Sequence, residues 1–363
     1  VNAGKSYSEA LEIYKVQFPG ADRIPQVLVL VATTYEKREM FAEASECLSS
    51  AIAIMRSKKQ EEKGDEVDGE KKEQTQRVIL TLVTSHAKCL SRKGDFKEAL
   101  ACYEDHISLV PDDAADRVEI VSDDMFQMGN LCARMHRLDA SIVYFEECIE
   151  MRKKEGDMEE GVAKAFFNMA VVQEKKEDYD AAIKSLREAL KYYKMKQLDA
   201  DVASTLHKLG RVQENIDHLE EALECYTEAI ELRRSGGGKD LATASTLHDY
   251  ASVLIKLGTD DKKAREVLEE CLTIRSSKAS RDDLETLESL HLFADLLIKK
   301  AEHQKAIKFL DRILAVRREQ LGKDHKDIGG CLHSLGLAYM ERGEIEEALE
   351  RLTESLPIRN ECF

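Results

Sequence analysis

The length, composition and charge of this chain exclude several classes of protein. Its 363 residues include 43% hydrophobic and 34% charged side chains, which is ordinary for amphipathic helices and too apolar for a disordered chain. Only four prolines occur, and no apolar stretch approaches the roughly 18 residues that a membrane-spanning helix needs. The net charge of −16 argues against general nucleic-acid binding, which requires a basic surface.

Small residues recur along the chain at nearly constant spacing. One set comprises Ala44, Ala99, Ser141, Ala182, Ala222, Ala264, Ala306 and Ala348, and from Ser141 onward its steps are 40 to 42 residues. A second set lies twelve or thirteen residues earlier, at Ala32, Ala87, Gly129, Ala170, Gly210, Ala251, Ala294 and Gly336. Two small residues at a fixed distance, repeated eight times, predict pairs of helices that approach closely, which is typical of a helical repeat array.

The first part of the chain departs from this spacing. Residues 1–20 resemble the second helix of a repeat whose first helix is missing. They therefore predict a leading helix that belongs to a partial repeat or caps the array. Because the helical pattern is already present at Val1, we expect that the chain is processed or truncated at its start. The stretch 57–77 is charged and nearly free of apolar residues. We expect a solvated loop or a helix extension there, with a regulated docking segment as the alternative.

Each repeat is expected to contain a helix A, a short turn and a helix B. In the last repeat, helix A is expected from about Ile328 to Arg342 and helix B from about Ile345 toward Arg359. Gly343 between them should take the left-handed conformation that ends a helix, as should Gly94 and Gly258 at equivalent turns. The predicted fold is an all-α solenoid, a single array over 25–363 with repeats at 25–57, 78–112, 117–155, 160–197, 200–235, 241–279, 283–321 and 325–363.

The last repeat resembles the tetratricopeptide repeat family. Leu335, Gly336 and Tyr339 spell the L-G-x-x-Y pattern of that family's helix A. The usual unit has roughly 34 residues, whereas the last three steps here are 42 residues long. The resemblance implies a right-handed superhelix whose helices A line a concave groove that binds peptides.

The longer unit is similar to the repeats of kinesin light chains. The segment LGKDHKDIGGCLHSLGLAYMERGEIEEAL, residues 321–349, follows that family's pattern closely. Lys326 replaces its proline, and His333 and Ser334 replace its paired asparagines. The resemblance covers about 117–363 and implies an adaptor that takes acidic cargo peptides.

One series of helix A residues, five positions after the small residue, should point into such a groove. Six of its eight members are basic, and we name these six the basic positions: Lys37, Arg92, Arg134, Lys175, Lys256 and Lys299, with Asn215 and Glu341 as the exceptions. A solvated helix end also favours cations through the helix dipole. The alternative interpretation is that these residues form an electropositive groove that attracts an acidic peptide.

A second series lies three residues before the small residue, and we name it the aromatic series. It comprises Phe126, Phe167, His207, His248, His291 and His333. The histidines are expected either to bond a peptide backbone or to make plain contacts between helices. Packed helices lie about 8–10 Å apart and metal–nitrogen bonds are near 2 Å, so we expect no metal there.

Co-chaperone tetratricopeptide domains grip a terminal carboxylate with residues of three successive helices A, and the chain matches them in part. Asn130, Asn168 and Arg211 fall where those domains place two asparagines and a basic residue. Phe126 and Asn215 stand where they need lysine and arginine. A receptor for a C-terminal carboxylate is therefore an alternative function, with a bidentate arginine as its anchor.

Two further residue types are expected to be structural. Nine cysteines occur without a CxxC pair, mostly at inward positions of helix B, which predicts free thiols and a reducing, cytoplasmic location. Arginine ends helix B in five repeats, where the helix dipole and the acidic residues of the next loop favour it: Arg152, Arg233, Arg275, Arg317 and Arg359.

These patterns favour binding over catalysis. The glycine-rich stretch at 235–240 lacks the flanking strand and the ending of a phosphate-binding loop, and no nucleophile motif occurs, so we expect no enzyme and no cofactor. The leading interpretation is an adaptor or scaffold whose concave groove binds an acidic or extended peptide. A structural subunit of a large assembly, using convex and helix B surfaces, remains the alternative. We expect no nucleic acid partner and no membrane insertion.

Overall fold

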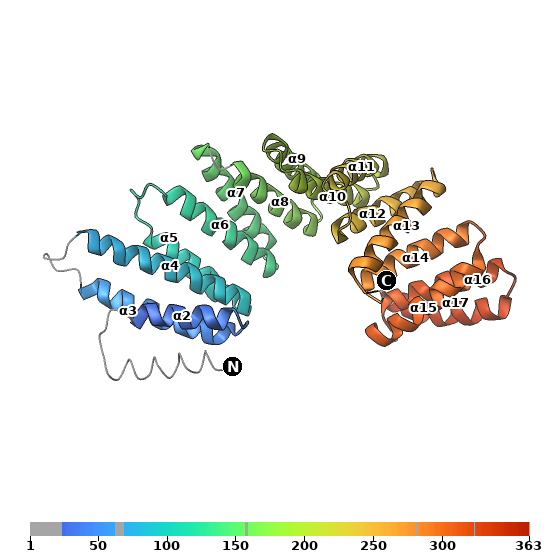
Figure 1. Cartoon of the computed structure of the whole chain (residues 1–363), viewed down its shortest axis with the longest axis horizontal. Coiled ribbons are helices and arrows are strands. Elements are labelled where there is room, and N and C mark those ends of the chain that lie inside the picture. Colours follow the sequence, from blue (N-terminus) through green and yellow to red (C-terminus); the bar gives the residue numbers. More distant parts are fainter. Residues whose placement is uncertain (1–23, 62–68, 157–158, 281, 323, 363) are drawn as a thin grey trace. The chain divides into compact units, whose positions relative to one another are not determined.

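The fold is built from helices alone. The computed structural model describes residues 24–61, 69–156, 159–280, 282–322 and 324–362, and within these ranges it contains sixteen helices and no strand. Most of these helices pack on the next helix in sequence, which confirms the predicted all-α repeat architecture (Figure 1). The chain divides into two compact units, residues 1–192 and 193–363. No described helix is long and apolar enough to cross a bilayer.

Among its described residues, the first unit contains seven helices, and the division falls within an eighth. Their bounds are α2 (Ile24–Glu36), α3 (Phe41–Glu61), α4 (Gly69–Lys93), α5 (Phe96–Leu109), α6 (Arg117–Arg134), α7 (Leu138–Glu155), α8 (Glu159–Lys175) and α9 (Tyr179–Met195).

The second unit continues with eight helices. Their bounds are α10 (Asp199–Asn215), α11 (Leu219–Ser235), α12 (Leu241–Leu257), α13 (Asp261–Lys278), α14 (Leu284–Lys299), α15 (His303–Leu321), α16 (Lys326–Glu341) and α17 (Ile345–Cys362). In both units the even-numbered helices are helices A and the odd-numbered ones are helices B.

Small residues let helix A and helix B of a pair approach closely, as the sequence pattern predicts. A methyl group added at Gly210 would lie 2.6 Å from Cε1 of Tyr226, and one at Gly336 would lie 2.5 Å from Cγ of Leu352. At Gly129 the nearest atom would be Cε1 of Phe145, at 2.8 Å. These distances are too short for a real carbon atom, so the aromatic and leucine side chains of helix B occupy the space that glycine leaves.

Every turn from helix A to helix B contains a residue in the left-handed region. Gly94, Gly258 and Gly343 have φ of 100°, 66° and 81°, as expected of glycines that end a helix. The other turns use a side chain at the equivalent position, with φ between 57° and 63°: Glu39, His136, Glu177, Asp217 and Ala301. The shape of the turn is therefore kept even where glycine is absent.

The charged stretch at 57–77 belongs to the flanking helices where it is described. Helix α3 continues to Glu61 and α4 begins at Gly69, in agreement with a helix extension. The expected leading helix at 1–20 lies outside the described residues.

Arginines at the ends of helices B join one pair to the next. Arg152 of α7 is buried and donates to the Ser122 hydroxyl of α6 at 3.2 Å and to the Gly161 carbonyl of α8 at 2.7 Å. Arg317 of α15 is also buried and donates to the Asp327 carbonyl of α16 at 3.2 Å. Each guanidinium thus bonds to a carbonyl in the first turn of the following helix A.

Candidate functional site

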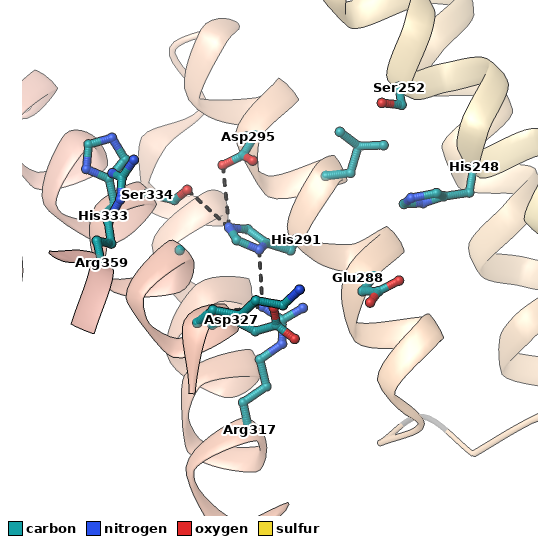
Figure 2. Close-up of a pocket in the computed structure, with 13 residues that line it drawn as sticks. His248, Ser252, Glu288, His291, Asp295, Arg317, Asp327, His333, Ser334 and Arg359 are labelled. Carbon is teal, nitrogen blue, oxygen red and sulfur yellow. Dashed lines mark hydrogen bonds and ion pairs between the residues drawn. The ribbon is translucent and has the colours of Figure 1, made fainter. Parts of the chain in front are cut away.

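A pocket of the second unit lies on the wall formed by its helices A. It has a volume of about 550 Å³. Figure 2 shows His248 and Ser252 of α12 on one side, and Glu288, His291 and Asp295 of α14 in the middle. The remaining lining residues are Leu292, Arg317, Lys326, Asp327, Gly330, His333, Ser334 and Arg359.

His291 lies at the centre of this pocket. One guanidinium nitrogen of Arg317 donates to its Nδ1 at 3.2 Å, and its Nε2 lies 3.1 Å from the Ser334 hydroxyl (Figure 2). Because Nδ1 accepts, the ring proton is on Nε2, which donates to Ser334. Burial, and to a lesser degree Arg317, lowers the pKa of His291, while Asp295 at 3.8 Å opposes that shift. The neutral imidazole is therefore the stable form.

Two other histidines of the aromatic series also bond to the following helix A. His207 Nε2 lies 2.8 Å from the Asp249 carboxylate, and His248 Nδ1 lies 2.9 Å from the Ser289 hydroxyl. The structure therefore brings these side chains together as contacts between helices, while His248, His291 and His333 also face the pocket. Within the described ranges, no group of three or more His, Cys, Asp or Glu could hold a metal ion.

The pocket contains three cations and three carboxylates. Arg317 is buried and engaged, whereas Lys326 and Arg359 are exposed and form no ion pair with any described residue. Arg359 lies beside His333 and, after burial, contributes to lowering the pKa of that histidine. The opposing carboxylates are Glu288, Asp295 and Asp327.

The first unit has a pocket of similar size, about 490 Å³, between α4, α5 and α6. Its floor holds a buried chain of hydrogen bonds: Thr84 Oγ1 lies 3.0 Å from Nε2 of His106, and Nδ1 of His106 lies 2.5 Å from the Asp124 carboxylate. Burial raises the pKa of Asp124, and His106 partly offsets that rise. The Thr84 hydroxyl also donates to the Leu80 carbonyl of its own helix at 3.0 Å.

The repeat pattern of the sequence does not reveal this chain of hydrogen bonds. His106 and Asp124 lie at positions where the other repeats have different residue types, so no repeated signal marks them. The network joins three helices of neighbouring pairs, which is a structural role for buried polar groups.

Three of the basic positions contact the preceding pair at the turn between helix A and helix B. Arg134 donates to both the carbonyl and the hydroxyl of Ser91 at 3.2 Å, and its guanidinium lies 4.3 Å from the centre of the Phe96 ring. Lys256 pairs with Glu214 at 2.6 Å and Lys299 with Asp261 at 2.8 Å. The other three, Lys37, Arg92 and Lys175, are exposed. None of the six lines either of the two pockets described above.

The residues matched to a carboxylate receptor lie in different units. In the first unit, the Asn168 amide donates to the Asn130 amide oxygen at 3.0 Å, so the two side chains partly satisfy each other. Phe126 is half-buried, with an edge contact of 5.7 Å to the ring of Phe145, and Phe167 is half-buried as well. Arg211 and Asn215 are exposed residues of α10 in the second unit.

Comparison with known families agrees with the geometry of the helix pairs. A model described as tetratricopeptide repeat matches residues 123–195, 201–277 and 282–361. Two further models of the same description match residues 167–230 and 85–116. No curated protein matches the chain.

Three solved structures illustrate the likeness. BtubC (BKLC) from P. vanneervenii is 18% identical with a TM-score of 0.54, covering 65% of this chain and 91% of that one. A STAND protein with a tetratricopeptide repeat sensor, from Pyrococcus horikoshii, is 14% identical with a TM-score of 0.62, covering 94% and 54%. Repeats of a kinesin light chain from Podosopora anserina are 18% identical with a TM-score of 0.49, covering 57% and 98%. At such identities the likeness concerns the fold alone.

Proposed function

The chain belongs to the tetratricopeptide repeat family, and on that basis we propose that it is a protein-interaction scaffold whose helix A wall binds an extended segment of a partner protein. The observation that carries this proposal is the pocket of the second unit, which three successive helices A line. Concave surfaces built from stacked helices are the binding surfaces of repeat proteins.

The polar groups of this pocket suit a peptide main chain. Ser252 and His248 offer a hydroxyl and an imidazole on one side of the pocket, and Ser334 offers a hydroxyl on the other (Figure 2). A hydroxyl can donate one hydrogen bond and accept two, so Ser334 keeps capacity beyond its bond to His291. A segment lying across these groups could satisfy its own amides without a defined side-chain sequence.

The free cations define where the segment should carry an acidic residue. Lys326 and Arg359 have no ion pair within the described part of the chain, whereas Lys256 and Lys299 are paired. Glu288, Asp295 and Asp327 would repel a segment that is acidic throughout. We therefore favour an extended segment with one acidic side chain near Lys326 and Arg359.

Binding without catalysis is part of the proposal. Cys89 and Cys148 are poor nucleophiles, since burial raises the pKa of each thiol to about 11. Free thiols also support a reducing location such as the cytoplasm.

The test is selection of peptides from a random displayed library, followed by calorimetric titration of the best binders. We expect Lys326→Glu/Arg359→Glu to weaken binding by tenfold or more, and added salt to weaken binding to the wild type. Arg187→Glu/Lys191→Glu, on exposed positions of α9, is the matched control and should bind normally. Equal affinity for the test and control variants would remove the helix A wall as the binding surface.

A further inference from the structure

Tyr103 has a buried hydroxyl group that no described residue satisfies. This tyrosine of α5 is 2% exposed and lines the pocket of the first unit. The equivalent tyrosine of a later helix B, Tyr226 of α11, donates to the Glu214 carboxylate at 3.1 Å, whereas the Tyr103 hydroxyl forms no hydrogen bond within the described part of the chain. Buried tyrosine hydroxyls usually have a partner, so this one is available to a molecule in the pocket.

Asp124 of α6 contributes a second available group to the same pocket. It is 3% exposed, and its Oδ2 lies 2.5 Å from Nδ1 of His106, while its Oδ1 has no hydrogen-bond partner among the residues that the structure describes. Burial, and then the charge of Asp124, raise the pKa of Tyr103, so the two side chains are close enough to interact electrostatically. The pocket therefore has two buried oxygen atoms, from neighbouring helices, that can accept hydrogen bonds.

No lysine or arginine of the described residues pairs with Asp124. Arg77 lines the pocket but pairs with Glu73 at 2.7 Å, and Lys88 is exposed and forms no ion pair within the described ranges. A carboxylate that burial separates from water needs a hydrogen-bonded cation to recover the cost of desolvation. Asp124 therefore favours a positively charged ligand group over an anionic one.

The rest of the pocket agrees with this preference. Asp123 of α6 bonds Arg152, and Asp116 is exposed and has no ion pair with a described residue. Leu80 and Ile120 are half-buried and give the walls an apolar part. The volume of about 490 Å³ lies within the usual range of ligand pockets, roughly 300–1,000 Å³. The lining thus suits a cation on an apolar stem.

From these observations we propose that the pocket of the first unit binds a primary ammonium group on an apolar stem. The ammonium donates to the Asp124 carboxylate and to the Tyr103 hydroxyl, and the stem lies against Leu80 and Ile120. A lysine side chain of a partner protein and a free alkylamine both have this chemistry. The site does not depend on the pocket of the second unit, on which the proposed function rests.

Probes with and without the ammonium group test the proposal. One pair is n-hexylamine and n-hexanol, and the other is a blocked pentapeptide with a central lysine between glycines and its counterpart with norleucine. Saturation-transfer NMR with the full chain should show at least tenfold tighter binding of each amine than of its neutral counterpart. Asp124→Asn should remove that preference, and Tyr103→Phe should weaken binding of both amines about threefold.

Two control variants separate this site from other effects. Asp180→Asn, at an exposed position of α9, removes the same charge and should bind the amines as the wild type does. Lys326→Glu/Arg359→Glu should also leave amine binding unchanged, so each of the two pockets can fail its test without the other. Circular dichroism should show the same helix content in every variant. If Asp124→Asn does not fold, Tyr103→Phe and the comparison of charged with neutral probes decide the outcome.

The same titrations identify the source of the ammonium group. Tighter binding of the lysine peptide than of n-hexylamine assigns the pocket to a partner protein, and the reverse order assigns it to a free amine. Equal affinity for an amine and its neutral counterpart, no binding of either amine, or unchanged amine binding in Tyr103→Phe would overturn the proposal.

Discussion

At the scale of single residues, the absence of a side chain decides how closely helices A and B approach. Tyr226 is fully buried, and its ring fills the space beside Gly210. We expect Gly210→Ala to lower the free energy of unfolding by about 1–2 kcal/mol, because overpacking outweighs the better helix propensity of alanine. Urea unfolding followed by circular dichroism measures this difference.

The control for that substitution is another helical glycine. No atom lies within 4 Å of the position that a methyl group at Gly69 would take. Gly69→Ala should therefore leave stability unchanged or raise it slightly. If both substitutions had the same effect, close approach of the helices would not explain the small residues.

Two buried histidines give the second unit a dependence on pH. Burial lowers the pKa of both His248 and His291 below the ordinary value of 6.5. The unfolded chain therefore binds more protons than the folded chain below pH 6.5, and stability falls on acidification from that pH. For each histidine, we expect the free energy of unfolding to fall by up to about 1.4 kcal/mol per pH unit. His248→Gln should show a shallower dependence on pH. Thermal unfolding between pH 7.5 and 5.5 measures both. An unchanged slope in that variant would contradict the assignment.

At the scale of helices, buried arginines hold consecutive pairs in register. Arg152 bonds both α6 and α8, and its removal would leave the Gly161 carbonyl and Ser122 without these partners. We expect Arg152→Met to lower the free energy of unfolding by about 2–3 kcal/mol and to speed amide exchange at the start of α8. Arg187→Met, at an exposed position, should change neither.

The sequence predicts those features of the helix pairs that recur in every repeat. The small residues at Gly129, Gly210 and Gly336, and the turn glycine at Gly343, mark close approach and helix ends because the same geometry is needed each time. The hydrogen bond between His106 and Asp124 occurs once, so the repeat pattern of the sequence does not predict it.

The proposed binding surface is harder to predict than the helices, because it depends on which charged side chains have no ion-pair partner. Arg134 and Lys299 repeat like groove residues, yet both contact the preceding pair, as their sequence positions alone do not reveal. Lys326 lies outside the repeated series, and Arg359 belongs to the arginines expected to be structural, so both became candidates only when their surroundings were known. Which side chains of neighbouring repeats form ion pairs depends on helix register and on side-chain rotamers. The spacing of the repeats in the sequence determines neither.

At the scale of the whole molecule, most contacts between the described helices join neighbours in sequence, and a few reach the next helix but one. The chain divides into two compact units. One core cluster of the second unit extends from Ala222 to Ile358. In such arrays, stability is close to a sum of terms for each repeat and for each neighbouring interface. A local defect should therefore weaken its own surroundings and leave distant pairs intact.

Leu296→Ala tests this expectation within the second unit. Leu296 is 1% exposed and belongs to the core of α14, so its truncation should cost about 2–5 kcal/mol. Amide exchange measured by mass spectrometry should quicken in α12 to α16 and stay unchanged in α2 to α5, because no interface that includes Leu296 reaches those helices. Val143→Ala, at an exposed position of α7, serves as the matched substitution and should alter neither region. Faster exchange throughout the chain after Leu296→Ala would instead indicate one cooperative folding unit, and stability could then no longer be assigned to neighbouring pairs.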